Sequence, residues 1–275
     1  MNLRALFLAL FAICTQASAP LYTSNYPANK QITEELGHLR AWKKLTSRNE
    51  TIIKQNIKQV SQPLHMPEAI LWCLLFQESR LNHLIGVEKP YSAQGIGQFI
   101  QFSFFEINHE LERYAPNGQR VFIQTLGRDV RPIAAMPKSR NHPSSYFNIP
   151  TAVVSSALFL NNRYLHLKRL LEKQKVTYNS DVLWLYAAMA YNKGSRTVLS
   201  FWNEYRKLYG TRGLEKLLGS AEATFSVLDQ DTLFQAAIRR IWSEDEVSRY
   251  AFEAKTHLKN IYGCSINDKT RRKKG

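Results

Sequence analysis

Apolar residues recur at spacings of three and four along most of the chain, and this periodicity restricts the possible folds more than any other feature. Such spacing gives an α-helix one apolar stripe, whereas half-buried strands alternate with a period of two. Convincing alternating segments are absent. The pattern therefore predicts a mainly α fold, with helices over residues 30–61, 66–82, 151–174, 181–191, 195–208, 212–219, 230–241 and 244–262.

Length and composition favour one domain rather than several. The chain has 275 residues, of which 44% are hydrophobic, and it shows no internal repeat or low-complexity linker. Residues 104–150 contain breaker-rich stretches such as "YAPNGQR" and "AMPKSRNHP". We interpret them as a long irregular insertion, and insertions of that length are usually functional or mobile.

The N-terminus has the layout of a secretory signal peptide over residues 1–19. The apolar run "ALFLALFAIC" is followed by the small residues of "TQASAP", with cleavage after Ala17 favoured because Pro20 directly follows Ala19. The run is too short to span a bilayer. An uncleaved anchor and a lipoprotein attached through Cys14 are the weaker alternatives. We therefore expect a periplasmic or secreted protein without a transmembrane segment after signal removal.

Export leaves two cysteines, Cys73 and Cys264, in an oxidising compartment that permits a disulfide. Cys73 lies inside an apolar helical segment, where a free cysteine behaves as a small hydrophobic residue. From this segment we expect an unpaired Cys73.

The net charge of +15 and the pI near 9.8 indicate an anionic partner. The clearest basic cluster is "KTRRKK" at 269–274, in a basic tail over 264–275. Nucleic acid is the usual partner of so basic a chain, but no recognition module is present. For an exported protein we expect the tail to bind the anionic cell envelope. A solvated tail without a specific partner is the alternative.

One acid, Glu78, ends an otherwise apolar run in "LWCLLFQESRLN". On a helix it shares a stripe with Leu71, Leu74 and Leu75, so its side chain leaves from the face that seeks the core. Desolvation there raises a carboxyl pKa and keeps the group protonated near neutral pH, as a general acid requires. The alternative, which this segment alone favours, is an ion pair with Arg80 or a cap on a neighbouring helix.

Two further stretches carry polar and glycine residues in suggestive positions. In "YSAQGIGQFI", residues 91–100, Gly95 and Gly97 allow close backbone approach, and Gln98 offers a donor and an acceptor. A plain turn is the alternative. In "AAMAYNKGSRTV", Tyr191 and Asn192 end an Ala-rich helix. On its own, that segment is an ordinary helix stop.

In this order, the "ES" pair at 78–79, "AQGIGQF" and "AYNKG" resemble the catalytic domain of lytic transglycosylases and goose-type lysozymes. The segment "EDEVSRYAFEAKTHLKNIY" at 244–262 looks like the closing helix of that domain. The resemblance covers about residues 61–263 as a lysozyme-like helical domain, with 20–60 as an N-terminal helical extension. Ser92 and Gly97 replace the usual glycine and methionine of the loop. Residues 104–150 and 199–243 look like insertions relative to compact members of the family.

The resemblance implies cleavage of the β-1,4 bond between N-acetylmuramic acid and N-acetylglucosamine in peptidoglycan, with Glu78 as the single catalytic carboxyl. The 2-acetamido group of the substrate then replaces a second carboxylate, and the product is a 1,6-anhydro sugar. Attack by water would make the protein a hydrolytic lysozyme, for which Asp129 and Glu88 are the acids to consider. A cell-wall-binding protein without turnover is a further alternative.

By the same resemblance, Tyr191 hydrogen-bonds to the acid or the reacting sugar, Gln98 and Gly95 contact the glycan, and Ser79 and Asn192 support the site. No cofactor or metal is implied. The "HE" pair at 109–110 lacks the second histidine of a zinc motif, because residue 113 is arginine.

Overall fold

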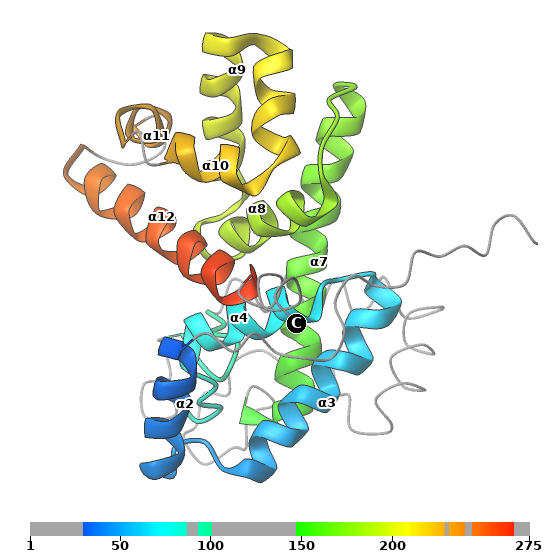
Figure 1. Ribbon diagram of the computed structural model, residues 1–275, viewed down its shortest axis with the longest axis vertical. Coiled ribbons are helices and arrows are strands. Elements are labelled where there is room, and N and C mark those ends of the chain that lie inside the picture. Colours follow the sequence, from blue (N-terminus) through cyan, green and yellow to red (C-terminus); the bar gives the residue numbers. More distant parts are fainter. Residues whose placement is uncertain (1–29, 87–92, 101–146, 229–230, 240–243, 267–275) are drawn as a thin grey trace, which may run out of the picture.

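The computed structural model describes residues 30–86, 93–100, 147–228, 231–239 and 244–266, and these ranges are helical apart from turns and one isolated bridge between Gln94 and Phe99 (Figure 1). The mainly α prediction is confirmed. Five features lie outside the described residues: the predicted signal segment 1–19, Glu88, Asp129, residues 101–146 of the irregular stretch and the basic cluster at 269–274. The helices are α2 (Lys30–Ala41), α3 (Ser47–Leu64), α4 (Glu68–Ser79), α7 (Ile149–Lys173), α8 (Ser180–Lys193), α9 (Ser195–Gly219), α10 (Ala221–Leu228), α11 (Asp231–Ile238) and α12 (Glu244–Ile266).

The prediction of one helix over 30–61 is wrong, because α2 and α3 are separate. Lys43 adopts a left-handed conformation with φ of 55°, which interrupts the helical path. Thr46 then starts α3 as its N-cap, and its Oγ1 accepts a hydrogen bond from the backbone N–H of Asn49. Sequence periodicity also missed α10. The predicted division into 195–208 and 212–219 agrees with the kink in α9 at Gly210, whose backbone is not helical.

Helix α4 is the centre of the core. All eight residues from Ala69 to Phe76 are buried, so no face of this part of the helix meets solvent. Helices α3, α7, α8 and α12 pack against it, and the 25-residue α7 also contacts α3 and α8 (Figure 1). Ile53, Ile57 and Val60 of α3 belong to the same core. The domain boundary predicted at residue 60 therefore falls inside a core helix.

Helix α8 is placed by clear end signals. Asn179 caps its N-terminus by accepting a hydrogen bond from the N–H of Asp181. Residues Val182–Ala190 are all buried. The helix ends at Gly194, whose φ of 82° suits glycine and whose N–H donates to the carbonyl oxygen of Ala190. The last turn of α8 thus presents Asn192 to Glu78 of α4 and Lys193 to Glu253 of α12, which packs on both α4 and α8.

The expectation of an unpaired Cys73 is wrong, because Cys73 forms a disulfide with Cys264. The two Cα atoms lie 5.8 Å apart across the contact between α4 and α12. Both cysteines are buried, so the bridge fits the apolar surroundings that had favoured a free thiol. The bond ties the last helix of the described chain to the central one.

We expect loss of this disulfide to lower the free energy of unfolding by about 2–5 kcal/mol, because the bridge closes a long loop in the unfolded chain. The measurement is denaturant unfolding with and without reductant. The matched control is a Cys73→Ala/Cys264→Ala variant, on which reductant should have no effect. A non-reduced digest without a linked Cys73–Cys264 peptide would contradict the assignment.

Candidate active site

Glu78 lies in the last turn of α4 with its side chain only 10% exposed. This low exposure confirms the predicted core-facing position of the side chain. The alternative ion pair with Arg80 is wrong, since the guanidinium Nε of Arg80 lies 2.9 Å from Oε2 of Glu35. Among the described residues, the carboxyl group of Glu78 contacts Asn192 of α8 and His257 of α12.

Two helices hold one oxygen of this carboxyl group. The side-chain amide of Asn192 on α8 donates to Oε1 of Glu78 at 3.0 Å. Nε2 of His257 on α12 lies 3.5 Å from the same oxygen. Oε2 of Glu78 makes no hydrogen bond to any residue in the described ranges. The two carboxyl oxygens are thus inequivalent, because among the described residues only Oε1 is held by polar side chains.

Burial is the main cause of the pKa shifts of Glu78 and His257. Desolvation raises the pKa of Glu78 to about 7, although the Asn192 hydrogen bond and the positive charge of Lys193 act in the opposite direction. Lys193 is nearly buried and pairs with Glu253 at 2.7 Å. Burial and Lys193 together lower the pKa of His257 to about 4, so this imidazole is neutral at physiological pH. Near neutral pH, Glu78 is therefore present in both its protonated and its ionised form.

Residues 94–99 form a tight turn that is pinned at both ends. Gln94 and Phe99 exchange two backbone hydrogen bonds, and the N–H of Gly95 donates to the carbonyl oxygen of Ile85. Gly95 has φ of 68°, as its glycine identity favours. The side-chain amide of Gln98 folds back to donate to the carbonyl oxygen of Gly95 at 2.9 Å. The turn therefore has a conformation fixed by its own hydrogen bonds.

Tyr191 joins this turn to α8. Its hydroxyl donates to the carbonyl oxygen of Gly97 at 2.7 Å and lies 3.4 Å from Oγ of Ser156. Its ring meets the ring of Phe159 edge-on, with centroids 5.0 Å apart. Burial and the nearby Glu78 raise the pKa of Tyr191, so the hydroxyl keeps its proton. Tyr191 bonds to the turn rather than to Glu78, contrary to one form of its predicted role.

The fold brings most of the predicted residues together, but in different ways. Asn192 contacts Glu78 directly, whereas Gly95 and Gln98 are linked to the site only through the turn that Tyr191 holds. Ser79 is buried, and its hydroxyl donates to the carbonyl oxygen of Leu75 on its own helix. That hydroxyl has no contact that supports Glu78.

His257 and Lys193 were missed by sequence reasoning. His257 lies on the buried stripe of α12 with Ala254, Leu258 and Ile261. A histidine on an apolar stripe is the signal that could have identified it, but a core histidine gives the same pattern. Only the packing of α12 on α4 shows that it meets Glu78.

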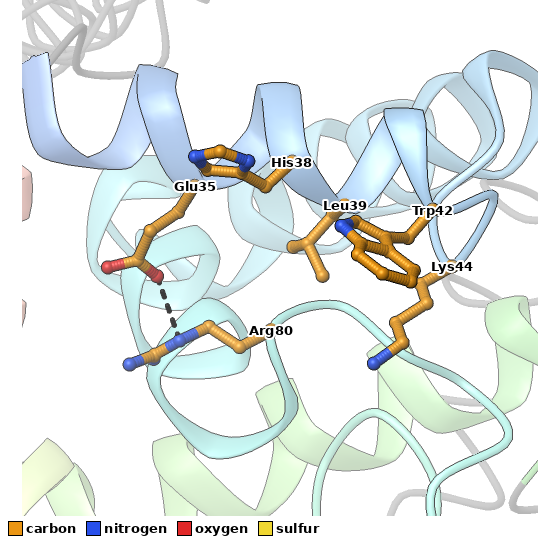
Figure 2. Close-up of a pocket in the computed structure, with 6 residues that line it drawn as sticks. All are labelled: Glu35, His38, Leu39, Trp42, Lys44 and Arg80. Atoms are coloured by element: carbon orange, nitrogen blue, oxygen red, sulfur yellow. Dashed lines mark ion pairs between the residues drawn. The ribbon is translucent and has the colours of Figure 1, made fainter.

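A hollow of ≈ 340 Å³ lies between α2 and the turn after α4 (Figure 2). The Glu35–Arg80 ion pair closes one side of it, and Trp42 and Lys44 stand at the other. Glu78 does not line this hollow, so we do not assign it to the carboxyl site. The lining residues are Glu35, His38, Leu39, Trp42, Lys44 and Arg80.

Within the described ranges, no three His, Cys, Asp or Glu side chains gather as metal ligands would. A scan against protein-family models finds no match for the chain, and neither do searches of curated proteins and of solved structures. The chemistry of the site must therefore be argued from its own residues.

Burial of Glu78 predicts a pH-dependent penalty on stability. The pKa is raised from 4.5 to about 7, so the folded state binds the proton more tightly. Proton binding by Glu78 therefore stabilises the folded state fully below pH 4.5, and this stabilisation is lost as pH rises through 7. The free energy of unfolding falls by about 3 kcal/mol over that range. We expect Glu78→Gln to remove this pH dependence and to be more stable than the unaltered protein above pH 7. Identical pH dependence of unfolding in both proteins would contradict the assignment.

The close packing around Gly97 leaves no room for a side chain at this position. A Cβ there would overlap the hydroxyl of Ser156 and lie 2.7 Å from the ring of Phe99. We expect Gly97→Ala to lower the free energy of unfolding by about 1–3 kcal/mol through overpacking. Gly263→Ala on α12 is the control, because a Cβ there meets nothing within 4 Å. Equal stability of the two variants would show that the turn can move away from α7.

Proposed function

We propose that this protein is a peptidoglycan-cleaving glycosidase in which Glu78 is the general acid. The observation that carries the proposal is a nearly buried carboxyl group with a pKa of about 7, held through Oε1 and without a described partner at Oε2. A group of this kind is partly protonated at neutral pH and has an oxygen available to donate from. The order of the "ES", "AQGIGQF" and "AYNKG" segments, with its resemblance to lytic transglycosylases, supplies the substrate class.

In the proposed reaction, protonated Oε2 of Glu78 donates to the glycosidic oxygen as the bond between N-acetylmuramic acid and N-acetylglucosamine breaks. The substrate's 2-acetamido group stabilises the developing positive charge at the anomeric carbon, so one protein carboxyl suffices. Ionised Glu78 then accepts the proton of the 6-hydroxyl, whose oxygen bonds to the anomeric carbon and gives a 1,6-anhydro product. If water attacks instead, the product is a reducing sugar and the enzyme is a lysozyme.

The remaining site residues take supporting roles in this proposal. Asn192 fixes the carboxyl group, and Tyr191 holds the glycine turn against α8. Gly95 and Gln98 lie on that turn, where we propose contact with the glycan strand. Glu88 and Asp129 remain the proposed acids for positioning water in a hydrolytic reaction.

The envelope location is part of the proposal. The disulfide between Cys73 and Cys264 supports export, because disulfides persist in oxidising compartments. No helix in the described ranges combines the length and apolarity needed to cross a membrane. The basic cluster at 269–274 is proposed to bind the anionic cell envelope.

We expect Glu78→Gln to reduce release of muropeptides from purified sacculi by ~10²-fold or more, because the amide cannot donate the acid proton. The control is Glu68→Gln in the first turn of the same helix. Burial raises the pKa of Glu68 too, but this residue lies about 15 Å along the helix from Glu78. Glu68→Gln should retain activity.

Activity of the unaltered protein should fall as pH rises through 7, because the ionised form of Glu78 cannot act as the acid. Mass spectrometry of the products distinguishes 1,6-anhydro from reducing ends. Undiminished digestion by folded Glu78→Gln would overturn the proposed role. Wall binding without turnover by the unaltered protein would support a binding protein instead.

A further inference from the structure

We propose that His257 is a positioning residue that acts through Glu78, donating a hydrogen bond from Nε2 to Oε1 once Glu78 has given up its proton. This inference rests on the proposed function, since it assigns His257 a part in the proton transfer. The contact it rests on is a property of the fold and can be tested without substrate.

The first argument is geometric. Nε2 of His257 is buried and has no hydrogen-bond partner in the described ranges, although it lies 3.5 Å from Oε1 of Glu78. A buried donor without a partner costs free energy, which is recovered when a charged acceptor forms beside it. Glu78 becomes such an acceptor on ionisation. The interaction is therefore stronger after proton donation than before it, as catalysis requires.

The second argument concerns the neighbouring charges. From α8, Asn192 donates to Glu78 and Lys193 pairs with Glu253 of α12. On α4, Arg80 is paired with Glu35. Burial and Lys193 keep His257 neutral, so it can donate without competing as a base for the proton of Glu78. The tautomer with hydrogen on Nε2 is assigned from this contact.

The third argument is that α12 is held in register with α4. The disulfide joins Cys264, seven residues after His257, to Cys73, five residues before Glu78. The side-chain amide of Asn260 also donates to Oε1 of Gln77 at 3.2 Å. These two links fix the contacting faces of the helices, and so they fix the position of the imidazole relative to the carboxyl group.

The test compares His257→Phe, which keeps a ring but lacks the donor, with His257→Gln, which retains a neutral donor. The pH midpoint of Glu78 ionisation is measured by ¹³C NMR of its carboxyl carbon, assigned with Glu78→Gln. We expect His257→Phe to raise the midpoint by about one pH unit, since the lost hydrogen bond stabilised the ionised form. His257→Gln should restore it towards the unaltered value.

Kinetics on sacculi provide the second measurement. We expect His257→Phe to lower kcat about tenfold with little change in KM, because the lost interaction forms only as the proton leaves. An unchanged midpoint in folded His257→Phe would overturn the role of His257. If His257→Phe shifts the midpoint but the unaltered protein cleaves no glycan, the proposed function would be overturned. The His257–Glu78 contact would still be supported.

A measurement on the unaltered protein covers the case in which His257→Phe does not fold. The ¹⁵N shift of Nε2 of His257 should change with the same pH midpoint as Glu78, and that transition should be absent in Glu78→Gln. An Nε2 shift that does not change through the ionisation of Glu78 would overturn the proposal.

Discussion

The structure depends on the burial of α4 on every side. A helix that is apolar around its circumference must be enclosed by other helices, because any exposed face would leave apolar surface in water. Helices α3, α7, α8 and α12 supply that enclosure. Each fully buried large apolar side chain contributes roughly 1.5–3 kcal/mol, so the run from Ala69 to Phe76 is a major source of stability.

Enclosure of α4 also creates the chemistry of its last turn. Glu78 follows Phe76 by two residues, so the helices that cover the apolar run also cover its carboxyl group. Desolvation outweighs the opposing effects of Asn192 and Lys193, and the pKa rises. The fold thus accepts a less stable ionised state at this position. Lys193 limits the penalty, because its positive charge favours the ionised form of Glu78.

The sequence predicted the helices well where apolar spacing was long and regular, as in α7, and predicted that Glu78 faces the core. It could not place the break near Lys43, because a single left-handed residue leaves no periodic signal. It also missed the partners on α12. Cys264 lies beyond the helix predicted over 244–262, in the predicted basic tail, whereas α12 continues to Ile266 and buries it. His257 has the pattern of an ordinary core residue until α12 is packed on α4.

The end of α8 couples the two halves of the site. Asn192 bonds to Glu78 on α4, while its neighbour Tyr191 bonds to Gly97 in the glycine turn. Consecutive residues on a helix point about 100° apart, so one helical turn can serve two separate elements. Gly194 ends the helix two residues after Asn192. A shift of this last turn would move the acid's partner and the turn's anchor together, so the geometry of the acid and of the turn cannot vary independently.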